Sequence, residues 1–152
     1  MEHQLAAEVR KSAEASFAAG LYCAESVLLS LARAQGIESE LLPRVATAFC
    51  GGMARTCGTC GALTGAIMGI GLALGRSRPA ESVQPCYAAT QRLIAQFEQE
   101  FGARDCHVLL GCDLGTPEGQ AMFRDDGLAE LCATYTGRAA EMAAQILAES
   151  RA

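Results

Sequence analysis

Residues 56–75, TCGTCGALTGAIMGIGLALG, form a stretch of twenty residues without a charge, flanked by Arg55 and Arg76. This length would suit a membrane span. However, six of the residues are glycines and two are cysteines, so the stretch is less hydrophobic than a leucine-rich span. We therefore predict that residues 58–74 form a buried helix at the centre of a helical bundle, and not a membrane span.

Three glycines of this helix, Gly61, Gly65 and Gly69, recur every four residues and so form a groove without side chains along one face. A glycine inside a helix costs about 1 kcal/mol relative to alanine, so another group must approach this face closely to compensate. We favour a second helix of the bundle as that group. Space beside a cofactor and a seam between two subunits are the alternatives, and the seam leads us to expect a homodimer.

The rest of the chain shows apolar residues at the spacing of three or four that is typical of helices. Thr116-Pro117-Glu118 is typical of a helix start, and Pro79 also suits the first turn of a helix. No segment alternates like a strand, so we predict an all-α, single-domain multi-helix bundle over residues 1–152 with a central Gly-rich helix. The other helices are expected at about residues 4–19, 22–35, 39–49, 79–101, 105–110 and 127–149, with a brief one after Thr116.

The charge of the chain argues against nucleic acid as a partner. The net charge is −5, the pI is near 5.0, and Lys11 is the only lysine. A phosphate-binding surface needs clustered lysine and arginine residues. The first residues lack the basic and apolar regions of a secretory signal, so we expect a cytoplasmic protein. Eight cysteines should stay reduced there, where such a number indicates metal or redox chemistry more often than structural disulfides.

Cys57 and Cys60 form a Cys-x-x-Cys pair at the start of the glycine-rich helix. Such a pair can close a disulfide or hold a metal, and both residues are candidates for a catalytic role. The helix dipole and the free N–H groups of the first turn favour a thiolate there, and Cys60 is the better placed. The strand and helix context of a thioredoxin is absent.

The six other cysteines are Cys23, Cys50, Cys86, Cys106, Cys112 and Cys132. Each alone could be a small hydrophobic core residue. Cys23 and Cys132 face inward from separate predicted helices, so their sulfurs could meet that of Cys60, and Cys106 follows Asp105 at a helix start. We interpret His3 and His107 as solvated residues, so a zinc site would have to be rich in thiolates.

Several segments together resemble the C_GCAxxG_C_C family, whose members are described as redox-active and are named for their cysteines. The segments are 17–23 with 26–28, 49–53, 60–65, and 106 to 119, in the family's order and over nearly the whole chain. The resemblance implies that the four family cysteines are Cys23, Cys60, Cys106 and Cys132. Cys50, Cys57, Cys86 and Cys112 are additional to the pattern.

Three functions are consistent with these residues. The leading hypothesis is a cysteine-based redox protein in which Cys23, Cys60, Cys106 and Cys132 converge, either on an iron–sulfur cluster or other metal, or as a redox-active dithiol. It would have an electron-transfer partner that the sequence does not identify. The second is a non-enzymatic protein that binds zinc or copper through four thiolates. The third is a helical interaction module with inert core cysteines. Of the additional cysteines, Cys57 is expected to be closest to the four.

Overall fold

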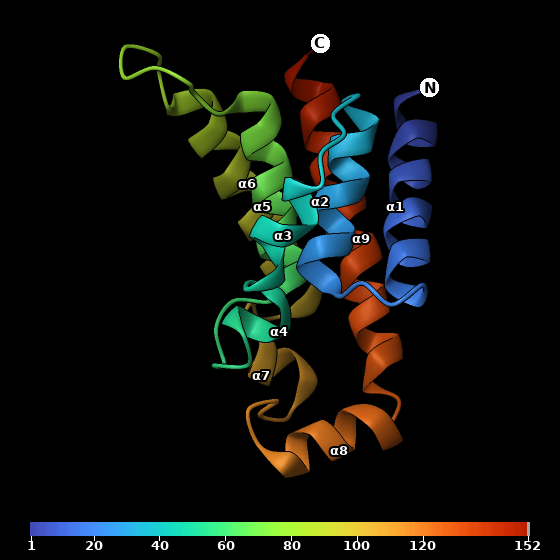
Figure 1. The fold of residues 1–152 in the computed structure, drawn as a ribbon. Helices are drawn as coiled ribbons and strands as arrows, with labels where there is room; N and C mark the ends of the chain where they lie inside the picture. Colours follow the sequence, from blue (N-terminus) through green and yellow to red (C-terminus); the bar gives the residue numbers. More distant parts are fainter. Residues whose placement is uncertain (152) are drawn as a thin grey trace.

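The computed structural model describes residues 1–151 and confirms the all-α prediction. Among these residues no strand is present, and the only bridge of the β type joins Thr59 to Asp105. Nor is any helix of the described part long and apolar enough to cross a membrane. The helices are α1 (Glu2–Ala18), α2 (Cys23–Ala34), α3 (Leu41–Thr47), α4 (Cys50–Met53), α5 (Gly61–Leu74), α6 (Gln84–Phe101), α7 (Cys106–Leu110), α8 (Pro117–Asp125) and α9 (Leu128–Ser150) (Figure 1).

The helices α2, α5 and α9 pack against one another in the main body of the bundle. Helix α1 covers α2 and α9, whereas α6 covers α5 and α9, and α3 lies on α2. The shorter helices α4, α7 and α8 gather at one end of the molecule, the lower end in Figure 1. Most of the cysteines lie at this end, so the packed long helices support the segments that carry them.

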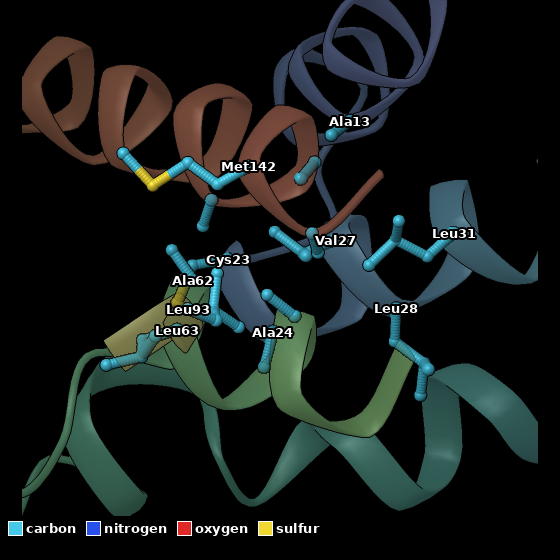
Figure 2. Close-up of a cluster of buried hydrophobic side chains, with 14 of the residues drawn as sticks. Ala13, Cys23, Ala24, Val27, Leu28, Leu31, Ala62, Leu63, Leu93 and Met142 are labelled. Carbon is cyan, nitrogen blue, oxygen red and sulfur yellow. The ribbon is translucent and has the colours of Figure 1, made fainter. Parts of the chain in front are cut away.

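The core is built mostly from aliphatic side chains, and its buried aromatic side chains are Phe97 and Tyr135. Figure 2 shows part of it, where Ala13, Val27, Leu63, Leu93 and Met142 come together from five helices. Cys23 is in the same cluster. The largest fully buried side chains include Phe97, Leu28, Leu31, Leu63, Ile70, Leu93 and Ile146.

The glycine face of α5 lies against α2 of the same chain. A Cβ atom added to Gly65 would come within 2.6 Å of the Ala24 carbonyl oxygen, and one added to Gly69 would collide with the Leu31 side chain. At Gly61 the added atom would collide with the sulfur of Cys23. At all three glycines, helix α2 therefore packs too closely to leave room for a side chain. This confirms the favoured explanation of the glycine spacing, close packing by a second helix.

Two helices begin later than their sequence patterns predict. The helix expected from Pro79 begins at Gln84, with Pro85 in its first turn. A helix that ran from residue 79 would have Pro85 in its interior, where the ring removes a hydrogen bond and clashes with a carbonyl, so the start at 79 was wrong. Helix α5 begins at Gly61 rather than at residue 58, and Cys60 is its N-cap residue.

Candidate functional site: a cavity lined by cysteines

A cavity of about 390 Å³ lies at the end of the bundle where α4, α7 and α8 gather. Its walls are mostly apolar and include Phe17, Leu110, Leu114 and Phe123. Five of the eight cysteines line it: Cys23, Cys50, Cys60, Cys106 and Cys132. All four cysteines of the family pattern are in this set, although they come from four separate segments of the chain.

Cys60 and Cys106 are brought to the cavity by the small bridge between Thr59 and Asp105. The backbone N–H of Cys60 donates to the Arg104 carbonyl (2.7 Å), and that of Cys106 donates to the Gly58 carbonyl (2.9 Å). Each cysteine stands at the start of a helix, α5 or α7, immediately after this paired segment. Two short backbone hydrogen bonds therefore hold the two helix starts together, in a way that helical periodicity does not predict.

Cys23 and Cys50 both lie against the start of α5. Both pack against Gly61, since a Cβ atom there would meet the Cys23 sulfur and would approach the Cys50 Cα within 3.1 Å. The Cys50 thiol donates to Oε1 of Glu25 (3.6 Å) and to the Ala46 carbonyl (3.7 Å). Cys50 is thus oriented by groups from both α2 and α3.

The chain leaves Cys50 through a left-handed turn. Gly51, Gly52, Met53, Ala54 and Arg55 all have positive φ values, between 57° and 72°. The N–H of Ala54 donates to the Cys50 carbonyl (3.0 Å) and that of Arg55 to the Gly51 carbonyl (3.1 Å). Left-handed backbone costs about 1–2 kcal/mol for each residue other than glycine, and such strain is concentrated at functional sites. Here the turn positions Cys50, Gly51 and Arg55 on the cavity wall.

Cys132 and Tyr135 close the cavity from α9. The Tyr135 hydroxyl donates to the Leu109 carbonyl of α7 (3.0 Å), and its ring packs edge-on against Phe101 of α6 (4.8 Å between centroids). Tyr135 therefore ties three helices together beside the thiols.

Replacing Tyr135 with phenylalanine is expected to lower the free energy of unfolding by about 1–3 kcal/mol, because the buried Leu109 carbonyl would lose its partner while the ring packing remains. Urea unfolding followed by circular dichroism measures this change. Tyr87→Phe, at an exposed position of α6, is the matched control and should leave the stability unchanged. Equal stability of both variants would show that the hydrogen bond does not hold α7 on α9.

Burial is the largest cause of the pKa shifts of three cavity thiols, those of Cys60, Cys106 and Cys132. It raises the pKa of Cys60 to about 12, although the N–H groups of Ala62 and Leu63 at the helix start lower it, as the sequence predicted. Burial also raises the pKa of Cys106 to about 11, and it raises the pKa of Cys132. The prediction of a favoured thiolate at Cys60 is therefore wrong for the metal-free chain. A bound cation would replace these protons and offset the cost of the buried charges.

The other three cysteines do not line this cavity. Cys57 lies outside it, where a hydrogen bond with Asp113 raises the pKa of its thiol. The Cys112 thiol donates to the Gly119 carbonyl (3.8 Å), and Cys86 lies half-buried on α6. The sequence predicts Cys57 as the additional cysteine closest to the four, but the structure places Cys50 in the cavity instead. The one sequence signal for Cys50 was its place directly before Gly51-Gly52.

Among the described residues, the thiols do not form a ready site for a single metal ion. Four thiolates bound to one zinc each lie about 2.3 Å from it. Within residues 1–151, no group of three or more cysteine, histidine or carboxylate side chains is close enough to hold one metal ion. His107 is exposed on α7, and neither it nor His3 lines the cavity. Cysteine is therefore the only residue type among cysteine, histidine and the carboxylates that lines the cavity, and thiolates are soft ligands.

The sequence was compared with models of known protein families. The model of the C_GCAxxG_C_C family, described as "putative redox-active protein", matches residues 21–146. The chain belongs to this family. No curated protein and no solved structure matches. In this member of the C_GCAxxG_C_C family, all four cysteines assigned to the pattern line the same cavity, and a fifth, Cys50, lines it with them.

Proposed function

We propose that this chain is an electron-transfer protein whose redox centre is an iron–sulfur cluster, held in the cavity by Cys23, Cys60, Cys106 and Cys132. One observation carries the proposal: four thiols from four distant segments line one cavity with apolar walls. Unrelated core cysteines have no physical reason to gather in this way, whereas the ligands of one centre must. Such a cluster supplies one-electron transfer when bound.

The four cysteines would hold the cluster from four segments of the chain, and the apolar walls would surround it. Cys60 and Cys106 are positioned by the paired segments around Thr59 and Asp105. Cys23 and Cys132 approach from the starts of α2 and α9. The apolar walls would exclude water, and burial and hydrogen bonds to sulfur are among the features that set the potential of a cluster.

Two other functions remain as alternatives. A redox dithiol would use the same thiols without metal. A non-enzymatic zinc or copper protein would need the sulfurs to move closer together, because the present arrangement holds no group of three around one ion among the described residues. We also propose that the protein is cytoplasmic, where its thiols would stay reduced, and that it has a separate electron-transfer partner. We propose that it is a homodimer joined through an apolar helix face, because the glycine face of α5 is covered by α2 of the same chain.

Purification without oxygen, followed by reconstitution with ferrous iron and sulfide, tests this function. We expect iron and acid-labile sulfide to remain bound after desalting, and serine at any of the four ligand positions to remove most of both. Cys86→Ser is the matched control and should retain the wild-type amounts, because Cys86 does not line the cavity. A colourless protein with one zinc per chain would select the metal-binding alternative. A wild-type protein that retains neither iron nor zinc would contradict both the cluster and the metal-binding alternative.

A further inference from the structure

Cys50 is the cysteine of the cavity that the family pattern leaves out, and its surroundings hold it next to Cys23. Both side chains are nearly buried, with 8% and 9% of their surface exposed, and both pack against Gly61. The neighbouring Cys23 thiol is also the largest cause that raises the pKa of Cys50. The Cys23 sulfur and the backbone of Cys50 therefore meet at the same point of α5, and both residues line the same cavity.

Glu25 fixes this arrangement. Its Oε1 atom accepts hydrogen bonds from the N–H of Tyr22 (3.0 Å) and from the Cys50 thiol (3.6 Å), and its Oε2 atom accepts from the Thr47 hydroxyl (2.9 Å). The same carboxylate thus ties the start of α2, where Cys23 lies, to the end of α3 and to Cys50. Glu25 is a positioning residue for the pair, because it holds the two segments together without reaching the Cys23 sulfur.

From this geometry we infer that Cys23 and Cys50 form a second redox activity of the protein, a dithiol that reduces small-molecule disulfides entering the cavity. The inference rests on the proposed function only in taking this cavity as the redox site, since the chemistry belongs to the metal-free chain. It assigns to Cys50 the role of the resolving thiol for Cys23.

The step balances as two successive thiol–disulfide exchanges. The Cys23 sulfur attacks one sulfur of the small disulfide, forms a mixed disulfide and releases the first small thiol. The Cys50 sulfur then attacks the Cys23 sulfur, forms the Cys23–Cys50 disulfide and releases the second small thiol. The two protein thiols lose two electrons and two protons, and the two released thiols gain them.

The cavity itself selects the class of substrate. A cavity of about 150 Å³ holds a benzene molecule, so about 390 Å³ has room for a small organic disulfide beside the thiols. Its walls from Phe17, Leu110, Leu114 and Phe123 favour an aliphatic or aromatic body, while Arg55 and Gln120 offer polar contacts at the edge. The disulfide of a folded protein would be too bulky to reach sulfurs this deeply buried.

Bis(2-hydroxyethyl) disulfide is a suitable probe for the fully reduced, metal-free chain, with mass spectrometry as the readout. Tryptic cleavage leaves Cys23 alone in the peptide of residues 12–33 and Cys50 alone in that of residues 45–55. We expect the chain to lose the mass of two hydrogens, and these two peptides to appear joined by a disulfide. Cys50→Ala should lose the joined peptides and accumulate a hydroxyethylthio group on Cys23 instead. Cys86→Ala is the control and should behave as the wild type.

Three results would overturn the inference. The first is a disulfide that joins any peptides other than 12–33 and 45–55. The second is a folded wild-type chain that does not react with the probe. The third is a Cys50→Ala chain that carries no adduct on Cys23. Cys50→Ser guards against a folding defect, because it keeps the side-chain volume and should give the same adduct with wild-type helical content. None of these measurements uses metal. Failure of the disulfide exchange would therefore contradict this inference alone, and failure of iron reconstitution would contradict the proposed function alone.

Discussion

Replacing Gly65 with alanine is expected to lower the free energy of unfolding by about 3 kcal/mol, at the upper end of the usual cost of overpacking. The new methyl group would lie 2.6 Å from the carbonyl oxygen and 2.9 Å from the Cα of Ala24. Both are backbone atoms of α2, so no side-chain rotation can relieve the contact, and the two helices must separate. Chemical denaturation followed by circular dichroism measures the loss.

Gly71→Ala provides the matched control in the same helix. Apart from its chain neighbours and the backbone of α5 itself, no atom lies within 4 Å of a Cβ placed there, so this variant should be more stable than the wild type by about 0.5–1 kcal/mol. Opposite signs for two identical substitutions, six positions apart, would show that the glycine face and not helix propensity decides the packing. If both variants were stabilised, α2 and α5 would not be in the contact described here.

Replacing Gly61 with alanine should disrupt the centre itself. The added methyl group would collide with the Cys23 sulfur and would lie 2.9 Å from the Phe49 carbonyl oxygen. It must therefore displace one proposed ligand and the segment that carries Cys50. We expect the reconstituted variant to lose more than half of its iron and labile sulfide while it keeps its helical content, and we expect the unfolding free energy to fall by about 1–3 kcal/mol.

The same Gly71→Ala variant serves as the control for Gly61→Ala, because it changes α5 at a position distant from the cavity lining. It should retain the wild-type amount of iron. Full retention of iron by Gly61→Ala would mean that Cys23 is not a ligand, and the centre would then have to be sought among Cys60, Cys106 and Cys132.

The helical class and the packing of the glycine-rich segment could be predicted from the sequence because both depend on local order. An uncharged stretch with Gly61, Gly65 and Gly69 on one face has few ways to compensate for three glycines, and a neighbouring helix is the simplest. The family resemblance added the four cysteines, which is information that spacing alone does not contain. The two helical inferences need only residues that are near one another in the chain, whereas the resemblance uses motifs from nearly its whole length.

The membership of the cavity and the chemistry of its thiols were decided only by the tertiary structure. Cys57 and Cys60 are neighbours in the sequence, yet the left-handed turn through Ala54 and Arg55 directs Cys57 outward and leaves Cys50 in the cavity. In the same way, the helix start lowers the pKa of Cys60 as the sequence predicted, but burial by distant segments outweighs it. Helical periodicity and helix dipoles act over one or two turns, whereas desolvation depends on every segment that covers a group, and so only the folded chain determines it.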